Sequence, residues 1–224
     1  MYAPRIITSI CDKIKLFYEA NTLKHHNFKG CWQVCHAFSI VNIPAVMEKR
    51  VCMFNWFKPD PGWIKLNTDG SYNGKVAGCG GILRNHLGQV IKEFAGPVMG
   101  NSAFIAELNG IIYGISMCIK LGYNRIWIEV DAMLLLHYIN NNSSFNAENY
   151  YLIRHLKQDL SNIIYKISHI YREGNVCADI LAKVGCNLLE FTKFNDHDIP
   201  KVVKGLVRLD RVGLPYIRYH DGIK

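Results

Sequence analysis

The sequence predicts an α/β fold in which one five-stranded mixed sheet carries helices on both faces. Three strand-like segments, residues 63–72, 76–84 and 89–95, follow one another with only turn sequences between them, which is typical of an antiparallel meander. The chain after residue 100 instead alternates helical patterns with two short β-branched runs, which is typical of strands added in parallel through helical crossovers. The expected order of elements is therefore β-β-β-α-β-α-α-β-α.

Turn residues bound the antiparallel part. A Pro-Asp-Pro-Gly cluster at residues 59–62 precedes the first strand and marks the expected entrance to the domain. The Asn-Gly pair at 73–74 is a strong signal for a tight turn, and a Leu-Gly pair at 87–88 separates the second strand from the third. Glycines inside the second strand predict a bulge or a close approach of another backbone; they are Gly78, Gly80 and Gly81.

Helical spacing dominates the second half of the chain. Ser102 is the expected N-cap of a helix whose apolar residues recur every three or four positions from Ile105 to Ile119, and Gly122 is its expected end. The remaining expected elements are a strand at 125–130, an apolar helical stretch at 131–139, a helix at 146–160, a strand at 163–171, a turn at 172–175 and a helix at 176–188.

The two ends of the chain lack the regular patterns of the middle. Residues 1–55 show no clear period, so we expect a weakly ordered N-terminal extension. The folded domain is expected over residues 56–188. A C-terminal tail at 189–224, which contains Pro200 and Pro215, is expected to pack irregularly.

The net charge of +8 favours a polyanionic partner. Lys and Arg outnumber Asp and Glu by 7 to 3 in residues 1–55, by 12 to 10 in residues 56–186 and by 7 to 5 in residues 187–224. Because the excess positive charge lies mainly in the flanks, charge alone gives only a weak preference for nucleic acid.

The chain lacks the sequence marks of a membrane or secreted protein. No apolar run reaches the roughly 18 residues of a membrane span, and residues 1–20 do not follow the pattern of a secretory signal. We therefore expect a soluble, intracellular monomer whose 8 cysteines are reduced. Cys31 and Cys35, with His25, His26 and His36 nearby, hint at zinc, but no second ligand pair is clearly spaced, and unpaired thiols are the alternative.

Four acids occupy conspicuous places in the predicted elements. Asp69 lies inside the first strand, where a carboxylate is costly unless it is paired or bound to a metal. Glu107 is placed in the first turn of its helix, Asp131 at the junction of a strand and a helix, and Asp179 in the first turn of the last helix. We predict that these four carboxylates converge on a metal site that cuts nucleic acid.

Each acid also has a structural explanation when it is taken alone. Asp131 could serve only as an N-cap. Glu107 and Asp179 could be first-turn acids that the helix dipole stabilises. From the residues alone, the structural explanation and the metal site therefore both stay open.

Five sequence pieces occur in one order between residues 63 and 185. They are Asp69-Gly70-Ser71, the glycine-rich segment at 78–84, Ala106-Glu107-Leu108, the segment at 128–132, and the stretch from His169 through Arg172-Glu173-Gly174-Asn175 to Ala178-Asp179. In this combination the chain resembles the ribonuclease H family. It is most similar to the plant ribonuclease-H-like domains related to retrotransposon (non-LTR) reverse transcriptases.

The resemblance implies a ribonuclease-H-like fold and hydrolysis of the RNA strand of RNA–DNA hybrids with two divalent ions, usually Mg²⁺, with Mn²⁺ as an alternative. It implies Asp69, Glu107, Asp131 and Asp179 as the metal ligands, and Mg²⁺ does prefer such hard oxygen atoms. It also implies that His169 takes part in proton transfer or product release; without the resemblance, His169 is only a histidine in a strand. Candidate contacts to the nucleic-acid backbone are Gly70, Ser71, Asn73, Ser102 and Asn175.

The chain departs from the family pattern at two places. Ala103 and Phe104 stand where many bacterial members carry asparagines that touch the nucleic acid, and no basic protrusion is evident between residues 136 and 150. We therefore expect a modest affinity for hybrids, for which the basic flanks could compensate. Two other functions stay open: a non-catalytic nucleic-acid-binding module derived from a mobile element, and a fragment of a larger reverse-transcriptase-like polypeptide.

Overall fold

A computed structural model describes residues 8–10, 12–14, 16, 49–140, 147–195 and 198–221 of the 224-residue chain. The chain divides into two compact units, Met1–Val51 with Tyr219–Lys224 and Cys52–Arg218. Most of the N-terminal extension, including Cys31 and Cys35, lies outside the described residues, so the predictions of weak order and of zinc are not tested there.

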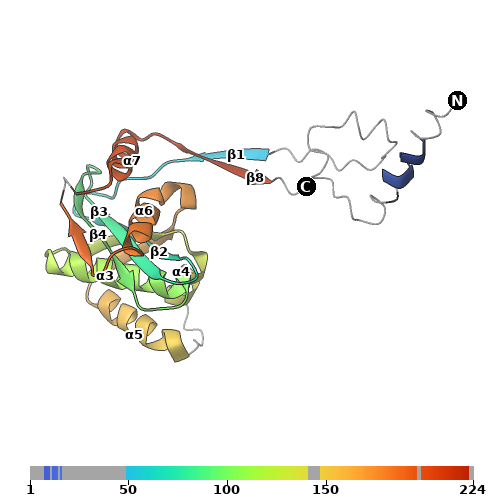
Figure 1. Ribbon diagram of the computed structural model, residues 1–224. Coiled ribbons are helices and arrows are strands. Elements are labelled where there is room, and N and C mark those ends of the chain that lie inside the picture. Colours follow the sequence, from blue (N-terminus) through green and yellow to red (C-terminus); the bar gives the residue numbers. More distant parts are fainter. Residues whose placement is uncertain are drawn as a thin grey trace. The chain divides into compact units, whose positions relative to one another are not determined.

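A six-stranded sheet with the strand order β6-β5-β2-β3-β4-β7 forms the centre of the Cys52–Arg218 unit (Figure 1). The antiparallel meander predicted from the sequence consists of β2 (Ile64–Tyr72), β3 (Ala77–Arg84) and β4 (Val90–Val98). The pairing register of β3 with β4 shifts between Leu83 and Arg84, where β4 contains one extra residue, Ile91. The three predicted segments are therefore confirmed as strands.

Three further strands complete the sheet. β5 (Arg125–Val130) pairs in parallel with β2, and β6 (Ile164–His169) pairs in parallel with β5, as predicted. The prediction of five strands was wrong by one, because β7 (Thr192–Phe194) pairs with β4 at the far edge. A strand of three residues is too short to show the period-two alternation by which strands are detected in a sequence.

Helices cover both faces of the sheet, as predicted (Figure 1). On one face lie α3 (Ala103–Lys120) and α5 (Ala147–Ser161), with α4 (Met133–Asn140) at its margin. On the other face lie α6 (Val176–Gly185) and α7 (Lys201–Val212). Ser102 is the N-cap of α3 as predicted, since its Oγ accepts a hydrogen bond from the N–H of Ile105 at 3.3 Å.

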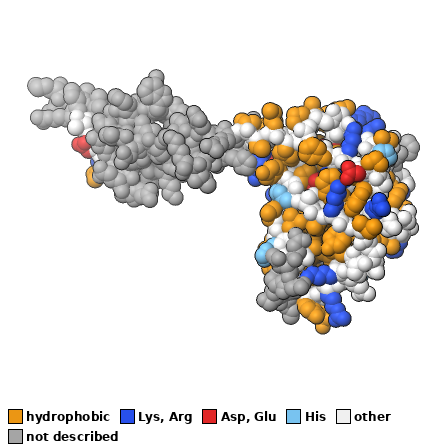
Figure 2. Space-filling view, turned by 180° about the vertical axis from the view of Figure 1, so that it is seen from behind, with side chains coloured by type: hydrophobic (Ala, Val, Ile, Leu, Met, Phe, Trp, Pro, Cys, Tyr) orange, Lys and Arg blue, Asp and Glu red, His pale blue; other side chains and the backbone are white. Residues whose placement is uncertain are grey.

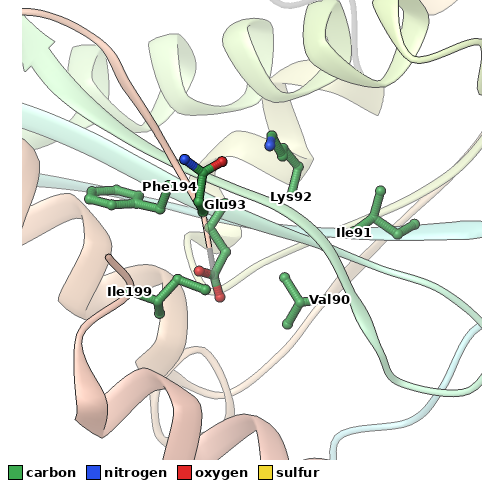
Figure 3. Close-up of a pocket in the computed structure, with 7 residues that line it drawn as sticks. Val90, Ile91, Lys92, Glu93, Phe194 and Ile199 are labelled. Atoms are coloured by element: carbon green, nitrogen blue, oxygen red, sulfur yellow. The ribbon is translucent and has the colours of Figure 1, made fainter. Parts of the chain in front are cut away.

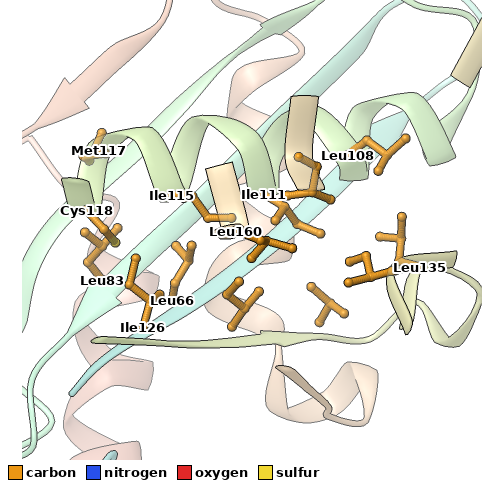
Figure 4. Close-up of a cluster of buried hydrophobic side chains, with 14 of the residues drawn as sticks. Leu66, Leu83, Leu108, Ile111, Ile115, Met117, Cys118, Ile126, Leu135 and Leu160 are labelled. Atoms are coloured by element: carbon orange, nitrogen blue, oxygen red, sulfur yellow. The ribbon is translucent and has the colours of Figure 1, made fainter. Parts of the chain in front are cut away.

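The main hydrophobic core lies between the sheet and α3 (Figure 4). Leu66 and Ile126 point from the strands toward Ile111 and Ile115 of the helix. By length and composition α3 is apolar enough to cross a membrane, although core helices pass the same test. Here the apolar residues of α3 pack against the strands and against α5.

The C-terminal tail is regular rather than irregular, which corrects the expectation for residues 189–224. Besides β7 it contains α7 and β8 (Tyr216–Asp221), and β8 pairs with β1 (Lys49–Phe54) in a separate two-stranded sheet. The buried residues of α7 follow one another at helical spacing; they are Val203, Val207 and Asp210. Val203 and Val207 pack into a second hydrophobic cluster. Helix α7 ends at Gly213, whose φ of 75° is left-handed.

Candidate active site

Three of the four predicted acids meet at one end of the sheet. One carboxylate oxygen each from Asp69, Glu107 and Asp131 can be chosen so that all three lie within 4.8 Å of one another. Asp69 is on β2 and only 2% exposed, whereas Glu107 on α3 and Asp131, just after β5, are half-buried. Side chains from three distant segments of the chain therefore form one compact acidic cluster, called the acid cluster below.

Glu107 does not lie in the first turn of its helix, contrary to the expectation from the sequence. Helix α3 begins at Ala103, and its first turn contains no acidic residue. The favourable effect of the helix dipole fades beyond the first turn, so capping electrostatics do not explain an acid at this position.

Two glycines allow the helices that carry acids to lie directly on the strands. A Cβ atom at Gly70 would lie 2.2 Å from the backbone nitrogen of Glu107 on α3. A Cβ atom at Gly80 would lie 2.4 Å from the backbone nitrogen of Ala182 on α6. The close backbone approach predicted from the glycines of β3 is confirmed, and it brings the helix that carries Asp179 toward the sheet.

Burial and crowding raise the pKa values of two acids in the cluster. Burial, followed by the charges of Asp131 and Asp179, raises the pKa of Asp69 to about 7. Burial, followed by the charges of Asp69 and Asp131, raises the pKa of Glu107 to about 10, against an opposing effect of Arg172. A nearby cation would reverse both shifts, because it favours the charged carboxylates.

The oxygen atoms of the cluster are suited to a cation. The Oε2 atom of Glu107 is buried and accepts no hydrogen bond from any described residue. A buried polar atom is normally paired, and three carboxylates in contact repel each other unless positive charge is present. A hard divalent ion would meet both requirements, so Asp69, Glu107 and Asp131 could hold a metal ion.

Asp179 stands apart from the three clustered acids. It lies in the first turn of α6, and its Oδ2 is 2.6 Å from Nζ of Lys183 one turn further on. Its charge is nevertheless one of those that raise the pKa of Asp69. The structure thus brings three of the four predicted ligands together and leaves the fourth beside them in a salt bridge.

Two basic residues border Asp131. His169, at the end of β6, places Nε2 3.2 Å from the backbone oxygen of Asp131, and its ring meets Tyr171 edge-on. Arg172 has Nε 3.9 Å from Oδ2 of Asp131 and a side chain that is 75% exposed. No role was predicted for Arg172 from the sequence, although its position between His169 and Asp179 was an available signal.

Asn175 is a buried support of the cluster, and this corrects its prediction as a nucleic-acid contact. It is 1% exposed, and its Nδ2 lies 2.9 Å from the backbone oxygen of Thr68 and 3.3 Å from Oδ1 of Asp131. Its Oδ1 accepts a hydrogen bond from Asn67 Nδ2 at 3.4 Å. The side-chain amide of Asn175 therefore links β2 to Asp131 through its hydrogen bonds.

The other predicted contact residues have varied surroundings. The N–H of Gly70 donates to Oδ1 of Asp69 at 2.9 Å, and Ser71 next to it is half-buried. Asn73 is exposed, and its Oδ1 accepts hydrogen bonds from the backbone of the β2–β3 turn. The hydroxyl of Ser102 caps α3. Contacts of these four residues with nucleic acid stay a prediction.

A buried polar layer beneath the acid cluster was not predicted from the sequence. Arg84 pairs with Asp210 of α7, donates through Nη2 to Oδ1 of Asn67 at 2.7 Å, and stacks on the ring of Trp56 at 3.6 Å. Asn67 also donates to Glu129 Oε2 at 3.0 Å. Polar contacts therefore run without a break from α7 through Arg84 and Asn67 to Asn175.

The same layer contains a buried lysine. Nζ of Lys65 lies 2.8 Å from Oε1 of Glu129 and donates to the backbone oxygen of Phe57 at 2.8 Å. Burial lowers the pKa of Lys65 to about 8, although Glu129 opposes the shift. Charged side chains at alternate positions of a strand resemble a solvent-facing pattern in a sequence, so their burial could not be read from it.

Two cavities lie away from the acids. One of about 350 Å³ lies between β4, β7 and the start of α7, where the carboxylate of Glu93 points between Val90 and Ile199 (Figure 3). Another of about 550 Å³ lies between α3 and α5, with Tyr113 and Phe191 among its lining residues. No predicted site residue lines either cavity.

Comparisons with known proteins agree with this architecture. RNase H1 of Halobacterium salinarum superposes with a TM-score of 0.53 at 19% identity, covering 56% of this chain and 98% of that one. The N-terminal RNase H domain of a Mycobacterium tuberculosis protein, solved as a maltose-binding-protein fusion, gives 0.52 at 21% identity, covering 56% and 94%. The protein therefore has the RNase H fold.

Sequence comparison gives the family. Residues 67–185 match the family described as reverse transcriptase-like, and the chain belongs to it. The chain is also 32% identical over 189 residues to an Arabidopsis thaliana protein named "Putative ribonuclease H protein". The match covers 81% of this chain and only 30% of that relative, so this chain corresponds to a minor part of the relative's length. The resemblance inferred from the motifs is confirmed.

Proposed function

We propose that the protein is a metal-dependent endonuclease that hydrolyses the RNA strand of RNA–DNA hybrids. The observation that carries the proposal is the acid cluster, in which Asp69, Glu107 and Asp131 reach within 4.8 Å of one another on an RNase H fold. The buried, unpartnered oxygen of Glu107 supports a cation between them.

The three clustered acids would hold one Mg²⁺ ion, and Asp179 would complete the set for a second. Bound divalent ions would supply activation of a water molecule and stabilisation of the leaving oxygen. Asp179 would have to exchange its partner Lys183 for the ion. Lys183 has an exposed side chain, so this salt bridge is weak and its exchange costs little.

Neighbouring residues would orient the acids and move protons. Asn175 holds Oδ1 of Asp131 from the protein interior, and Arg172 approaches its other oxygen from the solvent side. The exposed guanidinium of Arg172 would also attract a substrate phosphate. His169, whose Nε2 lies against the backbone of Asp131, would take part in proton transfer or product release.

The proposed substrate class rests on the family to which the chain belongs. Recognition of RNA would rest on 2′-hydroxyl groups in the shallow minor groove of the hybrid. Gly70, Ser71 and Asn73, which continue β2 and its turn beyond Asp69, are the proposed contacts.

A second candidate function is a nucleic-acid-binding module that does not cleave. The salt bridge between Asp179 and Lys183 favours it, because one predicted ligand is already paired. The Lys183→Ala variant separates the two functions: it should keep or raise Mg²⁺-dependent cleavage if the protein is a nuclease.

The test of the proposed function is cleavage of a labelled RNA–DNA hybrid by the purified chain in Mg²⁺, with and without chelator. Asp69→Asn should abolish cleavage and leave the circular dichroism spectrum unchanged. Asp60→Asn, which removes a carboxylate from an exposed site paired with Lys166, is the matched control and should cleave like the wild type. Cleavage by Asp69→Asn near the wild-type rate would refute the assignment.

A further inference from the structure

We propose that one side of helix α7 binds the phosphate backbone of the nucleic acid that the acid cluster engages. The proposal rests on the proposed function and extends it to a helix that lies beyond the family match at residues 67–185. The binding surface consists of Lys201, Lys204, Arg208 and Arg211, called the basic stripe below.

The spacing of the basic stripe places its side chains on one side of the helix. The intervals of three, four and three residues follow the helical repeat, so consecutive members are neighbours on the surface. Lys204 is half-buried and the other three are exposed. From end to end the stripe spans about 15 Å at the helical rise. Phosphates follow each other about every 3.4 Å along one strand, so the stripe matches a run of several phosphates.

All charged side chains on the exposed surface of α7 are positive, because the single acidic residue of the helix, Asp210, is buried. Asp210 is 2% exposed, pairs with Arg84 and accepts a hydrogen bond from the hydroxyl of Tyr216 at 2.7 Å. Within the described part of the chain, no member of the basic stripe takes part in a salt bridge. An ordinary solvated helix face would mix both signs of charge.

Burial of the adjoining side of α7 fixes the direction in which the stripe points. Val203 is fully buried and Val207 nearly so, and both belong to the hydrophobic cluster that contains Leu181 of α6 and Ile82 of the sheet. The helix therefore cannot turn about its axis without exposing this cluster. A rigid row of charges loses less entropy on binding than charges on a loose tail.

The stripe lies one helix away from the acids. Helix α7 packs against α6, whose first turn carries Asp179. Packed helices are about 8–10 Å apart, whereas one turn of duplex is about 34 Å long, so a bound duplex extends well past the neighbouring helix.

The positive surface continues from α7 to the start of the domain. A Cβ atom placed on Gly88 would lie 2.9 Å from Cγ of Arg211 and 3.4 Å from Cε of Lys58, so these two basic side chains flank the same turn. On the face drawn in Figure 2, Lys and Arg side chains are scattered between hydrophobic areas of the Cys52–Arg218 unit.

The experiment compares two charge-matched triple variants of the full chain. The stripe variant is Lys201→Gln, Lys204→Gln, Arg208→Gln. The control variant removes three exposed cations from α3, β5 and α5: Lys120→Gln, Arg125→Gln, Arg154→Gln. Binding to a fluorescent RNA–DNA hybrid is measured in chelator, so cleavage plays no part, over about 50 to about 200 mM salt.

We expect the stripe variant to bind the hybrid on the order of 10- to 100-fold more weakly at the lowest salt, with a salt slope smaller by about three. The control variant should keep the wild-type affinity and slope. Lys201→Arg with Lys204→Arg should bind like the wild type, and all variants should show the wild-type Tm.

Equal affinities of the stripe variant and the control variant would overturn this inference and leave the nuclease assignment standing. A wild-type protein that binds no hybrid at all would overturn both. Binding of the same variants to anionic phospholipid vesicles is measured as well. Exposed apolar residues beside the stripe could contact a membrane; they are Val202, Leu209 and Val212. Loss of vesicle binding by the stripe variant with unchanged hybrid binding would assign the surface to membranes and overturn the proposal.

Discussion

Asp69 and Glu107 make the metal-free protein sensitive to pH. Both have pKa values raised by burial and by neighbouring carboxylates, to about 7 and about 10. A raised pKa means that the folded state binds the proton more tightly than the unfolded state does. The stability that these protons contribute is present at low pH, and it is lost as pH rises from about 4 toward each folded pKa.

The first prediction is therefore that the Tm of the protein in chelator falls between about pH 5 and about pH 8. Each of the two acids contributes at most about 1.4 kcal/mol per pH unit to this fall. Glu107→Gln, which cannot ionise, should show a flatter profile and a higher Tm than the wild type at the alkaline end. Thermal unfolding curves check this, and parallel profiles for the two proteins would contradict it.

Mg²⁺ should raise the wild-type Tm most strongly at high pH, because the ion binds the charged carboxylates and releases protons. The Glu107→Gln variant should respond to Mg²⁺ much less. This comparison detects the ion without any measurement of cleavage.

Asn175 leads to a second prediction. Asn175→Ala removes the donor to Asp131 and to the backbone of Thr68 and leaves a buried carbonyl unpaired. We expect a loss of about 2–3 kcal/mol of stability and about 10- to 100-fold weaker Mg²⁺ binding. Asn162→Ala, an exposed amide at the end of α5, is the control and should change neither quantity. Titration calorimetry and denaturant unfolding measure the two effects.

The sequence identified the individual acids better than their partners. Asp69, Glu107 and Asp131 were found because each stands at an element boundary or in an apolar context and in a recognisable motif. The role of Asn175 inside the protein was missed because the sequence alone does not distinguish a buried asparagine beside the Asp179 motif from an exposed one. Burial of that kind depends on β2, β5 and α6 meeting in space, which a linear pattern does not contain.

The packing of α3 on β2 leads to a third prediction. Gly70→Ala should destabilise the protein by about 1–3 kcal/mol or more, because its Cβ would clash with the backbone at Glu107. It should also reduce cleavage, since Glu107 must move away from Asp69.

Gly205→Ala is the matched control: nothing lies within 4 Å of the added Cβ in the middle of α7, so stability should rise by about 0.5–1 kcal/mol. Urea unfolding measures the free energy of unfolding of both variants, which should fall for Gly70→Ala and rise for Gly205→Ala.

Elements with a long, regular pattern were predicted well, and short or interrupted ones were not. The expected strand at 125–130 coincides with β5, and Ser102 is the N-cap that the sequence indicated. Helix α7 was missed although its buried residues follow helical spacing, because prolines flank the segment and Gly205 stands within it. Its helical form depends on the tertiary cluster with α6, which outweighs the local propensity.

The buried pair of Arg84 and Asp210 ties helix α7 to strand β3 of the sheet, and it leads to a fourth prediction. Asp210→Ala should cost about 3–5 kcal/mol, because it leaves the charge of Arg84 buried and unpaired. Asp198→Ala, an exposed acid shortly before α7, should have little effect. Replacing both members of the pair, Arg84→Met with Asp210→Leu, should recover much of the loss. Denaturant unfolding of the wild type and these three variants measures the changes in stability.

The folded unit extends from Cys52 to Arg218, whereas the sequence pattern suggested an end at residue 188 and the family match stops at residue 185. Recombinant fragments that end at the family boundary would lack helix α7. They would therefore lack Asp210, the counter-ion of Arg84, and the valines that share a hydrophobic cluster with Ile82. Such fragments should collect in inclusion bodies, and an inactive preparation of one would not test the proposed nuclease activity. Expression clones for biochemical work should therefore keep the chain through Arg218.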